Sequence, residues 1–380
     1  MKPINYFIYI FLLSFLSFTS CRQTSGRNKQ ETLTGSSSLS HAKGFDIDYS
    51  DKGYTQITVF NPWSPGAIYE TYYLVKDSTT LTPKDGQTIT IPIKELMVNS
   101  VTYLSFLDLL GLNNQIVGVS STNYIYSPDI HDRIQRNEIV DLGDDYNLDI
   151  ERLLLLHPNA VMTSAYNAED ENTKRLRQSG LHIIYNIEWQ EETLLGRAEW
   201  IKFIAAFFDK DSLANELFMD IETKYLEAKE IVSQADIEKP SALVGQDYRG
   251  SWSMPGGKSF NAQLLSDAGI RYHYADNQSR GSLTTTIEEA LVYFNNADLW
   301  INVQASTLDE MAALDQRYKL FNAYKSGEIY NINKRKNKRG GNDYWELGVA
   351  RPDLLLKDLI KIAHPALLPD YELTFMEKLQ

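Results

Sequence analysis

Aromatic side chains with polar neighbours follow several predicted strands, and this pattern is typical of a binding cleft. Tyr124 and Tyr126 come after an apolar strand that ends at Val119. In the second half, the segments Tyr248–Trp252 and Asn342–Trp345 combine aromatic rings with a cation or an amide. Because ligands of open α/β sheets bind beyond the carboxyl ends of the strands, these loops can meet around one ligand. The chemistry is recognition by flat, rigid rings, which suits a macrocycle or a catecholate.

The candidate ligand contacts share these loop positions. We select Tyr124, Tyr126, Arg249, Trp252, Asn342, Tyr344 and Trp345. The chain contains 23 tyrosines and 6 tryptophans, which is high for tyrosine. Each aromatic candidate has an alternative role as a core or rim residue, and the sequence leaves that alternative open.

Residues 334–339 form the sharpest local charge feature, a run of lysines and arginines interrupted only by Asn337. The run directly precedes the loop at Gly340. In an acidic chain, it can form a basic edge of the cleft that attracts an anionic chelate. The alternative is a solvated surface loop. If the basic run contacts the ligand, its positive charge favours an anionic ligand, namely a ferric siderophore or haem with its propionates, over cobalamin.

The spacing of residues in this chain matches no common motif for nucleophilic catalysis or for metal binding. Serine hydrolases of the common α/β type carry Gly-x-Ser-x-Gly, which this chain lacks. Pro255–Ser259 lacks the spacing of a phosphate loop, so its glycines indicate a sharp turn or close backbone approach. The histidines form no pair at metal-ligand spacing, although His273 could face the cleft and ligate a haem or corrin metal. We therefore predict no enzyme activity, no metal site and no cofactor, with a lipid-anchored glycan-binding or hydrolytic protein as a distant alternative.

The thiol of Cys21 is the other group with a clear chemical use. Lys2, the apolar stretch Ile4–Phe18 and two small residues lead up to this cysteine. A positive start, an apolar stretch and a small-residue exit are typical of a secretory signal. A cysteine directly after them resembles a bacterial lipobox, in which the thiol takes a diacylglycerol. Residues 1–20 are then a signal peptide, and residues 21–41 form a polar, lipidated tether in the periplasm.

Charge and cysteine content exclude several function classes. Removal of the signal peptide takes away Lys2 and no acid, so the formal net charge moves from −13 to −14. A negative net charge of this size argues against nucleic acid as a partner, because nucleic acid is itself negatively charged. Cys21 is the single cysteine, so the fold depends on its core without an internal disulfide. We expect a monomer. Arg22 and not Asp follows the cysteine, which leaves the choice between inner and outer membrane open.

The elements that must position these loops alternate between strands and helices after residue 96. Strands are predicted at 115–119, 160–163, 181–185, 242–244 and 299–303. Such alternation predicts parallel sheets that are covered on both faces. Residues 194–208 interrupt it with an amphipathic helix. A helix over residues 212–234 follows without Gly or Pro and is long enough to connect two lobes.

The predicted fold class is therefore α/β, with two Rossmann-like lobes around central sheets, joined by one long α-helix and preceded by a β-rich extension. The predicted boundaries are 1–20 for the signal peptide, 21–41 for the tether, 42–95 for the extension, 96–190 for the N-terminal lobe, 191–236 for the helical connection and 237–380 for the C-terminal lobe. Alternating segments at 56–60 and 87–91 indicate strands in the extension. The sequence assigns the extension no role.

A short pattern occurs once in each half of the chain. Glu151 and Glu289 each open a short apolar helix, which a turn and a buried strand follow. Two copies suggest two similarly built lobes. A carboxylate in the first helical turn is favoured by the helix dipole, and this alone explains both residues without any function.

These segments carry a family resemblance. The chain resembles substrate-binding proteins of bacterial ABC importers, of the class that carries cobalamin, haem and ferric siderophores. The resemblance covers roughly residues 96–365. Its carriers are residues 107–120, residues 147–158, the long helix, the Glu289 segment and residues 342–346.

The resemblance implies a fold, a ligand and a partner. In that class, two lobes joined by a rigid helix hold the ligand between them. Glutamates matching Glu151 and Glu289 dock onto arginines of the permease dimer. The resemblance thus implies a lipid-anchored binding protein that delivers an iron chelate, either a ferric siderophore or haem, to an ABC importer. Cobalamin is the alternative ligand.

Overall fold

The structure is a computed structural model that describes residues 39–49, 51–144, 147–167 and 171–380. The predicted signal peptide, Cys21 and nearly all of the tether lie outside these residues. Within the described part of the chain, no helix combines the length and apolar character that crossing a membrane requires.

The first described strands form a four-stranded sheet of order β1-β2-β3-β4, which we call the N-terminal sheet. The strands are β1 (Phe45–Asp48), β2 (Thr55–Phe60), β3 (Ile68–Val75) and β4 (Gln87–Thr90). Strands β1 to β3 pair antiparallel, whereas β4 is parallel to β3. In β2, Ile57 and Val59 are buried and their neighbours are not, so the alternation in sequence reflects one packed face.

The N-terminal lobe contains a five-stranded sheet of order β11-β10-β5-β6-β7, in which every pairing is parallel. Its strands are β5 (Leu96–Val98), β6 (Ile116–Val119), β7 (Val140–Asp141), β10 (Ala160–Thr163) and β11 (His182–Tyr185). Its helices are α1 (Leu104–Leu109), α2 (Pro128–Gln135), α3 (Ile150–Leu156) and α4 (Glu171–Gln178), and β8 (Gly143–Asp144) pairs with β9 (Asn147–Leu148). Strand β10 is buried at every position, as expected when both faces of a parallel sheet are covered.

The C-terminal lobe contains a four-stranded sheet of order β12-β16-β17-β18, parallel except for the last pairing. Its strands are β12 (Ala242–Val244), β16 (Leu299–Val303), β17 (Ile329–Asn331) and β18 (Glu377–Lys378). A small antiparallel sheet consists of β13 (Asp247–Tyr248), β14 (Ser251–Pro255) and β15 (Ser282–Thr285). The helices are α7 (Phe260–Asp267), α8 (Ile287–Phe294), α9 (Leu308–Leu314), α10 (Asn322–Ser326) and α12 (Pro352–Ala363).

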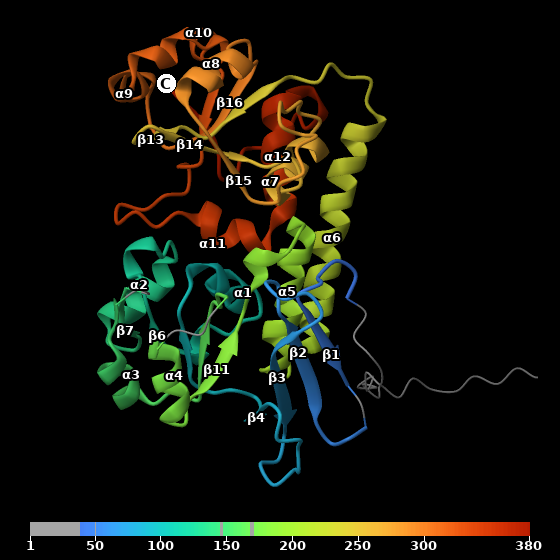
Figure 1. The fold of residues 1–380 in the computed structure, drawn as a ribbon, viewed down its shortest axis with the longest axis vertical. Coiled ribbons are helices and arrows are strands. Elements are labelled where there is room, and N and C mark those ends of the chain that lie inside the picture. The colour runs from blue at the N-terminus through green and yellow to red at the C-terminus, as the bar shows by residue number, and fades with distance from the viewer. Residues whose placement is uncertain (1–38, 50, 145–146, 168–170) are drawn as a thin grey trace, which may run out of the picture. The chain divides into compact units, whose positions relative to one another are not determined.

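Three helices connect the two lobes: α5 (Leu194–Ala206), α6 (Asp211–Gln234) and α11 (Asp343–Ala350). Helix α6 spans about 36 Å and packs against both α5 and α12, as Figure 1 shows. Helix α11 is shared, because Val349 and Ala350 belong to the core of the N-terminal lobe and Tyr344 to that of the C-terminal lobe. The predicted fold class, with two parallel-sheet lobes, a long helix and an N-terminal sheet, is confirmed.

Two carboxylates, Glu199 on α5 and Glu191 just before it, hold the segment that enters the N-terminal sheet. Glu199 is fully buried and accepts the backbone N–H groups of residues 40–42 at 2.8–2.9 Å. Glu191 accepts those of residues 43–44 at 2.8 and 3.0 Å, and the indole N–H of Trp200 at 2.9 Å. Burial raises the pKa of Glu191, whereas in Glu199 the hydrogen bonds outweigh burial and lower the pKa. The entering segment is therefore tied to α5 through its backbone, independently of its side chains.

Glu199→Ala removes the acceptor of these N–H groups from a partly buried contact. We expect the free energy of unfolding at pH 7 to fall by about 2–4 kcal/mol, because hydrogen bonds to a charged group contribute about 1.5–3 kcal/mol each and water replaces part of the loss. Urea unfolding followed by circular dichroism measures this change.

The exposed Glu216 on α6 provides the matched control, since Glu216→Ala should change stability by less than about 0.5 kcal/mol. Because folding lowers the pKa of Glu199 from 4.5, its contribution is present above that value and is lost as pH falls through the folded pKa. The unfolding free energies of wild type and of Glu199→Ala should therefore become equal at acidic pH. Equal stability at pH 7 would contradict the anchoring role.

Candidate functional site

A cavity of about 1240 Å³ is lined by the N-terminal sheet, the N-terminal lobe and the C-terminal lobe. Its walls follow the carboxyl ends of parallel strands: Tyr124 after β6, residues 187–192 after β11, Gly245 after β12, Gln304 after β16 and Ile332 after β17. Loops from both lobes converge at this position, where α/β folds bind ligands. The volume exceeds the range of about 300–1,000 Å³ that drug-sized ligands need, so the cavity suits a larger molecule.

Partly exposed aromatic rings give the cavity its apolar walls. Phe60, Tyr124, Trp189 and Trp345 line it and are between 38% and 65% exposed. Rings in this state are free to stack on a ligand, and their rigidity keeps the entropy cost of binding low. Phe60 and Trp189 are not among the contacts predicted from the sequence, although Trp189 follows β11 in the same way that Tyr124 follows β6.

The charged groups of the cavity are mainly cationic. Its cations are Lys43, Lys258, Arg280 and Lys336, and its acids are Glu191 and Glu192. Glu191 accepts backbone and indole donors, as described above. Glu192 accepts a hydrogen bond from Lys43 at 3.0 Å, which lowers its pKa, and also contacts Arg280. Lys258 and Lys336 make no ion pair with any residue that the structure describes. Two positive charges are therefore available to an anionic ligand.

Three of the ligand contacts selected from sequence line this cavity: Tyr124, Asn342 and Trp345. Asn342 also caps α11, because its Oδ1 accepts the N–H of Tyr344 at 3.0 Å. Its Nδ2 donates to the carbonyl of Ile332 at 2.9 Å. The amide thus fixes the start of the helix that presents Trp345 to the cavity.

Trp252 lies in the core of the C-terminal lobe, and this position gives no support to the expected contact with ligand. Its side chain is 0% exposed, and its ring stacks on Trp300 with 5.7 Å between centroids. Its Nε1 donates to the carbonyl of Val244 at 2.9 Å. Buried and exposed residues alternate along β14, and Trp252 is on the buried face.

Tyr126, Arg249 and Tyr344 also lie outside the wall of this cavity. The ring of Tyr126 faces the guanidinium of Arg335 at 5.4 Å, and Tyr344 is buried in the core of the C-terminal lobe. Arg249 is exposed in the turn between β13 and β14. The geometry lends these three residues no support as ligand contacts.

The basic run at 334–339 contributes Lys336 to the cavity. Lys334 donates to the backbone of Leu373, and Arg335 pairs with the buried carboxylate of Asp343 at 2.6 Å. Lys338 is exposed and is not part of the cavity wall. The predicted basic edge is thus supported at one position, while other members of the run serve the packing of the C-terminal lobe.

The glycines at 256 and 257 allow a close approach of backbone to backbone. A Cβ at Gly256 would lie 2.5 Å from the carbonyl oxygens of Ser279 and Gly281. At Gly257 it would lie 2.4 Å from two further carbonyl oxygens, those of Tyr274 and Asn277. This packing places the loop that carries Arg280 against the end of β14.

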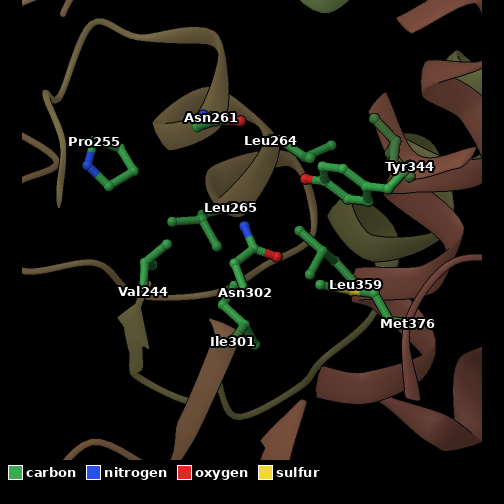
Figure 2. Close-up of a pocket in the computed structure, with 11 residues that line it drawn as sticks. Val244, Pro255, Asn261, Leu264, Leu265, Ile301, Asn302, Tyr344, Leu359 and Met376 are labelled. Carbon is green, nitrogen blue, oxygen red and sulfur yellow. The ribbon is translucent and has the colours of Figure 1, made fainter. Parts of the chain in front are cut away.

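A second cavity of about 10 Å³ adjoins the first one and is drawn in Figure 2. Both cavities are lined by Val244, Pro255, Asn261 and Asn302. Its volume is at the lower limit for a single water molecule, so it cannot hold an organic ligand.

The two helices that carry the paired glutamates are built alike. Asp149 caps α3 and Thr286 caps α8, each with a side-chain oxygen that accepts a backbone N–H. The first residue of each helix, Ile150 or Ile287, is buried. Counted from the caps, the residue of α8 that matches Glu151 is therefore Glu288 and not Glu289.

Glu288 and Glu289 differ in what their carboxylates do. Glu289 completes a capping box and accepts hydrogen bonds from Thr285 Oγ1 at 2.7 Å and the N–H of Thr286 at 3.2 Å. Glu288 is exposed and pairs with Arg317 at 2.6 Å. Glu151 is exposed as well.

An apolar side chain accompanies each exposed carboxylate. Four residues beyond Glu151 and Glu288 stand Leu155 and Val292, which are 86% and 75% exposed. The helices of the two lobes thus present matching pairs of one carboxylate and one apolar group to solvent.

The described residues contain no group of three His, Cys, Asp or Glu side chains that could hold a metal ion. His273 stacks on the ring of Tyr293 at 4.3 Å between centroids and does not line the cavity. The idea that His273 ligates a haem or corrin metal therefore gains no support from its position.

Glu346 of α11 joins the two lobes beside this cavity. Its carboxylate accepts the backbone N–H of Tyr126 at 2.7 Å and of Ser127 at 3.2 Å, both in the N-terminal lobe. Asn337 adds a second link, because its Nδ2 donates to the carbonyl of Ile125 at 2.8 Å. Burial raises the pKa of Glu346 to about 7, and the nearby Asp343 acts in the same direction.

Comparison with known proteins places this geometry among binding proteins. A sequence model of the family described as periplasmic binding protein matches residues 98–335, which is more than half of the chain. An uncharacterized lipoprotein of Methanocaldococcus jannaschii is 22% identical over 351 residues, with 86% of this chain and 82% of the relative covered. A second uncharacterized lipoprotein of that organism is 24% identical over 299 residues, covering 74% of this chain and 73% of the relative.

Solved structures share the fold. A possible iron-binding (periplasmic solute-binding) protein from Staphylococcus epidermidis has a TM-score of 0.58 and 19% identity, with 72% of this chain and 100% of that chain covered. A periplasmic heme binding protein from Pseudomonas aeruginosa has a TM-score of 0.55 and 13% identity, with 72% of this chain and 94% of that chain covered. At these identities, the similarity establishes the architecture alone.

Glu346→Gln tests whether this inter-lobe contact titrates near neutral pH. Because folding raises the pKa of Glu346 from 4.5 to about 7, wild type loses stability relative to the neutral Gln variant as pH rises from 4.5 to 7. We expect the difference in unfolding free energy between the two proteins to change by up to about 3 kcal/mol over this interval. Urea unfolding at pH 4.5, 6 and 8 measures it. A difference that is constant with pH would contradict the raised pKa.

Proposed function

The chain belongs to the periplasmic binding protein family, and on this premise we propose that it captures a bulky anionic iron chelate, a ferric siderophore or haem, and delivers it to an ABC importer. The observation that carries the proposal is the cavity of about 1240 Å³, which combines exposed aromatic rings with Lys258 and Lys336. The family binds and carries ligands without converting them, so the mechanism is capture and release.

The charge of the cavity favours an anion over the alternative ligand cobalamin. Lys258, Arg280 and Lys336 come from the C-terminal lobe, and Glu192 is already engaged by Lys43 and Arg280. A carboxylate- or catecholate-bearing chelate would gain from the two lysines that lack an ion-pair partner among the described residues. A ligand without negative groups would leave these charges unused.

The connection between the lobes supports a small closing motion on capture. Helix α6 packs against α5 and α12, α11 contributes to both cores, and Glu346 bonds across the lobes. Several rigid contacts of this kind favour a small shear or rocking motion over a wide hinge movement. We assign permease docking to the two helix starts, at Glu151 in one lobe and at Glu288 or Glu289 in the other.

The proposal extends to location. We infer that Cys21 is lipidated and that the residues between Cys21 and the segment held by Glu199 tether the binding body to a bacterial membrane in the periplasm. The supporting observations are the order of Lys2, the apolar stretch, the small residues and Cys21, together with the word lipoprotein in the names of two relatives.

Ligand titration tests the proposal directly. Quenching of tryptophan fluorescence, to which Trp189 and Trp345 contribute, follows binding of hemin, a ferric tris-catecholate and cyanocobalamin. We expect one of the two anionic iron chelates to bind at least about tenfold more tightly than cyanocobalamin. Preferred binding of cyanocobalamin, or binding of none of the three, would overturn the proposed ligand class.

The double variant Lys258→Gln/Lys336→Gln tests the charge argument. We expect Kd for the preferred chelate to rise about tenfold at low ionic strength and the difference to shrink as salt is added, because salt screens the lost attraction. Lys338→Gln is the matched control, since Lys338 belongs to the same basic run and does not line the cavity. A double variant that binds as tightly as wild type would remove these lysines from the site.

The double variant Glu151→Lys/Glu288→Lys tests docking. We expect uptake of the chelate by cells that carry only this variant to fall at least about tenfold, while Kd for the chelate stays within about twofold of wild type. Counting of cell-associated radioactive iron measures uptake. Glu216→Lys/Glu227→Lys, two exposed positions on α6, makes the same change in net charge away from the docking helices.

A second double variant tests whether Glu288 or Glu289 is the docking residue on α8. Glu151→Lys/Glu289→Lys should reduce stability through loss of the capping box, since a lost cap costs about 1 kcal/mol. If uptake falls with Glu289 and not with Glu288, the docking residue is Glu289. Lost ligand binding in either double variant would refute a role confined to docking.

A further inference from the structure

The N-terminal sheet forms part of the cavity wall, although it lies outside the residues that match the family. The family match begins at residue 98, whereas the sheet ends with β4 at Thr90. The sheet nevertheless lines the cavity with seven residues: Lys43, Gly44, Phe60, Asn61, Pro62, Pro65 and Gly66. Most of these belong to the end of β2 and the turn that leads to β3, which we call the β2–β3 turn (residues 60–67).

The sheet is part of the body of the N-terminal lobe. The ring of Phe45 packs on Trp200 of α5 with 4.7 Å between centroids, and both belong to one continuous core with the strands of the lobe. The hydroxyl of Tyr72 accepts the N–H of Tyr185 in β11 at 2.8 Å. Gln87 exchanges two hydrogen bonds with the backbone of Ile183, at 2.8 and 3.1 Å. These contacts fix the sheet against the edge strand of the lobe.

Hydrogen bonds within the β2–β3 turn and at its base stabilise its shape. The Oδ1 of Asn61 accepts the N–H of Trp63 at 2.9 Å and of Ser64 at 3.0 Å. Backbone bonds from Phe60 to Gly44 at 2.8 Å and from Asn61 to Ala67 at 2.9 Å close the turn at its base. A preformed wall of this kind adds affinity because little conformational freedom is lost on binding.

An aromatic cluster supports the turn from behind. The ring of Trp63 packs against Tyr69 at 5.8 Å and against Trp189 at 6.3 Å between centroids. Trp189 itself lines the cavity after β11. The turn of the extension and the strand-end loop of the N-terminal lobe therefore form one continuous surface.

The chemistry of this wall differs from that of the C-terminal lobe. Residues 60–67 contain no charged side chain, and Phe60, Pro62 and Pro65 are exposed. Lys258 and Lys336, which form no ion pair within the described part of the chain, come instead from the C-terminal lobe. The cavity thus has an apolar wall at the β2–β3 turn and cations on the C-terminal lobe. This arrangement is complementary to an anion that also has an apolar surface.

We propose that the β2–β3 turn is a specificity-determining wall of the ligand site, which contacts the apolar ring periphery of an anionic chelate while the C-terminal lobe binds its negative groups. This inference rests on the proposed function and deepens it. Phe60 provides the main ring contact, and Pro62 and Pro65 extend the apolar surface. Lys43 closes the rim of the cavity, because Glu192 bonds to Lys43 at 3.0 Å and also contacts Arg280 of the C-terminal lobe.

Phe60→Ala tests this wall with the tightest-binding probe among hemin, the ferric tris-catecholate and cyanocobalamin. We expect Kd to rise about tenfold, because an aromatic contact and its buried area are lost. Phe60→Trp keeps a flat ring and should restore Kd to within about threefold of wild type. Ile68→Ala is the matched control, because Ile68 is 60% exposed in the same sheet and does not line the cavity. It should change Kd by less than about twofold.

The outcomes separate this inference from the proposed function. Suppose that wild type binds a chelate, and that Trp345→Ala weakens this binding while Phe60→Ala does not. The role of the β2–β3 turn as a ligand-contacting wall is then refuted, and the proposed function stands. If Ile68→Ala weakens binding as much as Phe60→Ala, the sheet acts through stability alone, and the wall is again refuted. If wild type binds none of the probes, the proposed function fails, and the inference fails with it. Thermal unfolding by circular dichroism verifies that Phe60→Ala is folded, as expected for a partly exposed ring.

Discussion

The burial of two carboxylates, Glu199 on α5 and Glu191 just before it, is the constraint on which the cavity depends. A carboxylate removed from water is unfavourable by several kcal/mol unless hydrogen bonds compensate, and here the backbone of residues 40–44 supplies most of them. The same hydrogen bonds give these N–H groups their acceptors in a partly buried contact. It fixes the start of the N-terminal sheet, and the β2–β3 turn reaches the cavity because that start is fixed.

The remaining parts of the site follow from how parallel sheets are built. Strand ends of both lobes point toward the cavity, so residues far apart in sequence, such as Trp189 and Trp345, line the same space. Helix α11 and Glu346 then set the distance between the lobes. Affinity in such a site depends on a preformed wall and on charges that lack internal partners. The exposed carboxylates of the proposed docking helices α3 and α8 lie outside the wall of this cavity, so capture and the proposed docking use separate surfaces.

The outcome at individual residues shows what periodicity can and cannot predict. Strand β10 and helix α8 were predicted because a buried strand and an apolar helix that a carboxylate opens have clear local patterns. Strand β3 was missed because its second half is buried throughout and shows no alternation. Trp252 follows a strand just as Tyr124 does, yet the pleat of β14 turns it into the core. Local spacing also paired Glu151 with Glu289, whereas the caps pair it with Glu288.

The sequence by itself determined the fold class, the long helix, the segments with strand-end aromatics and the placement of Cys21 behind an apolar stretch, because each is encoded in the order of neighbouring residues. Tertiary structure decided which aromatics face the cavity, which lysines lack an acid partner among the described residues, and that the N-terminal sheet contributes Phe60 to the cavity wall. These properties depend on contacts between residues that are distant in the chain. These contacts contribute free energy only when the sheets pack together, so they cannot be predicted from the pattern of neighbouring residues in the sequence.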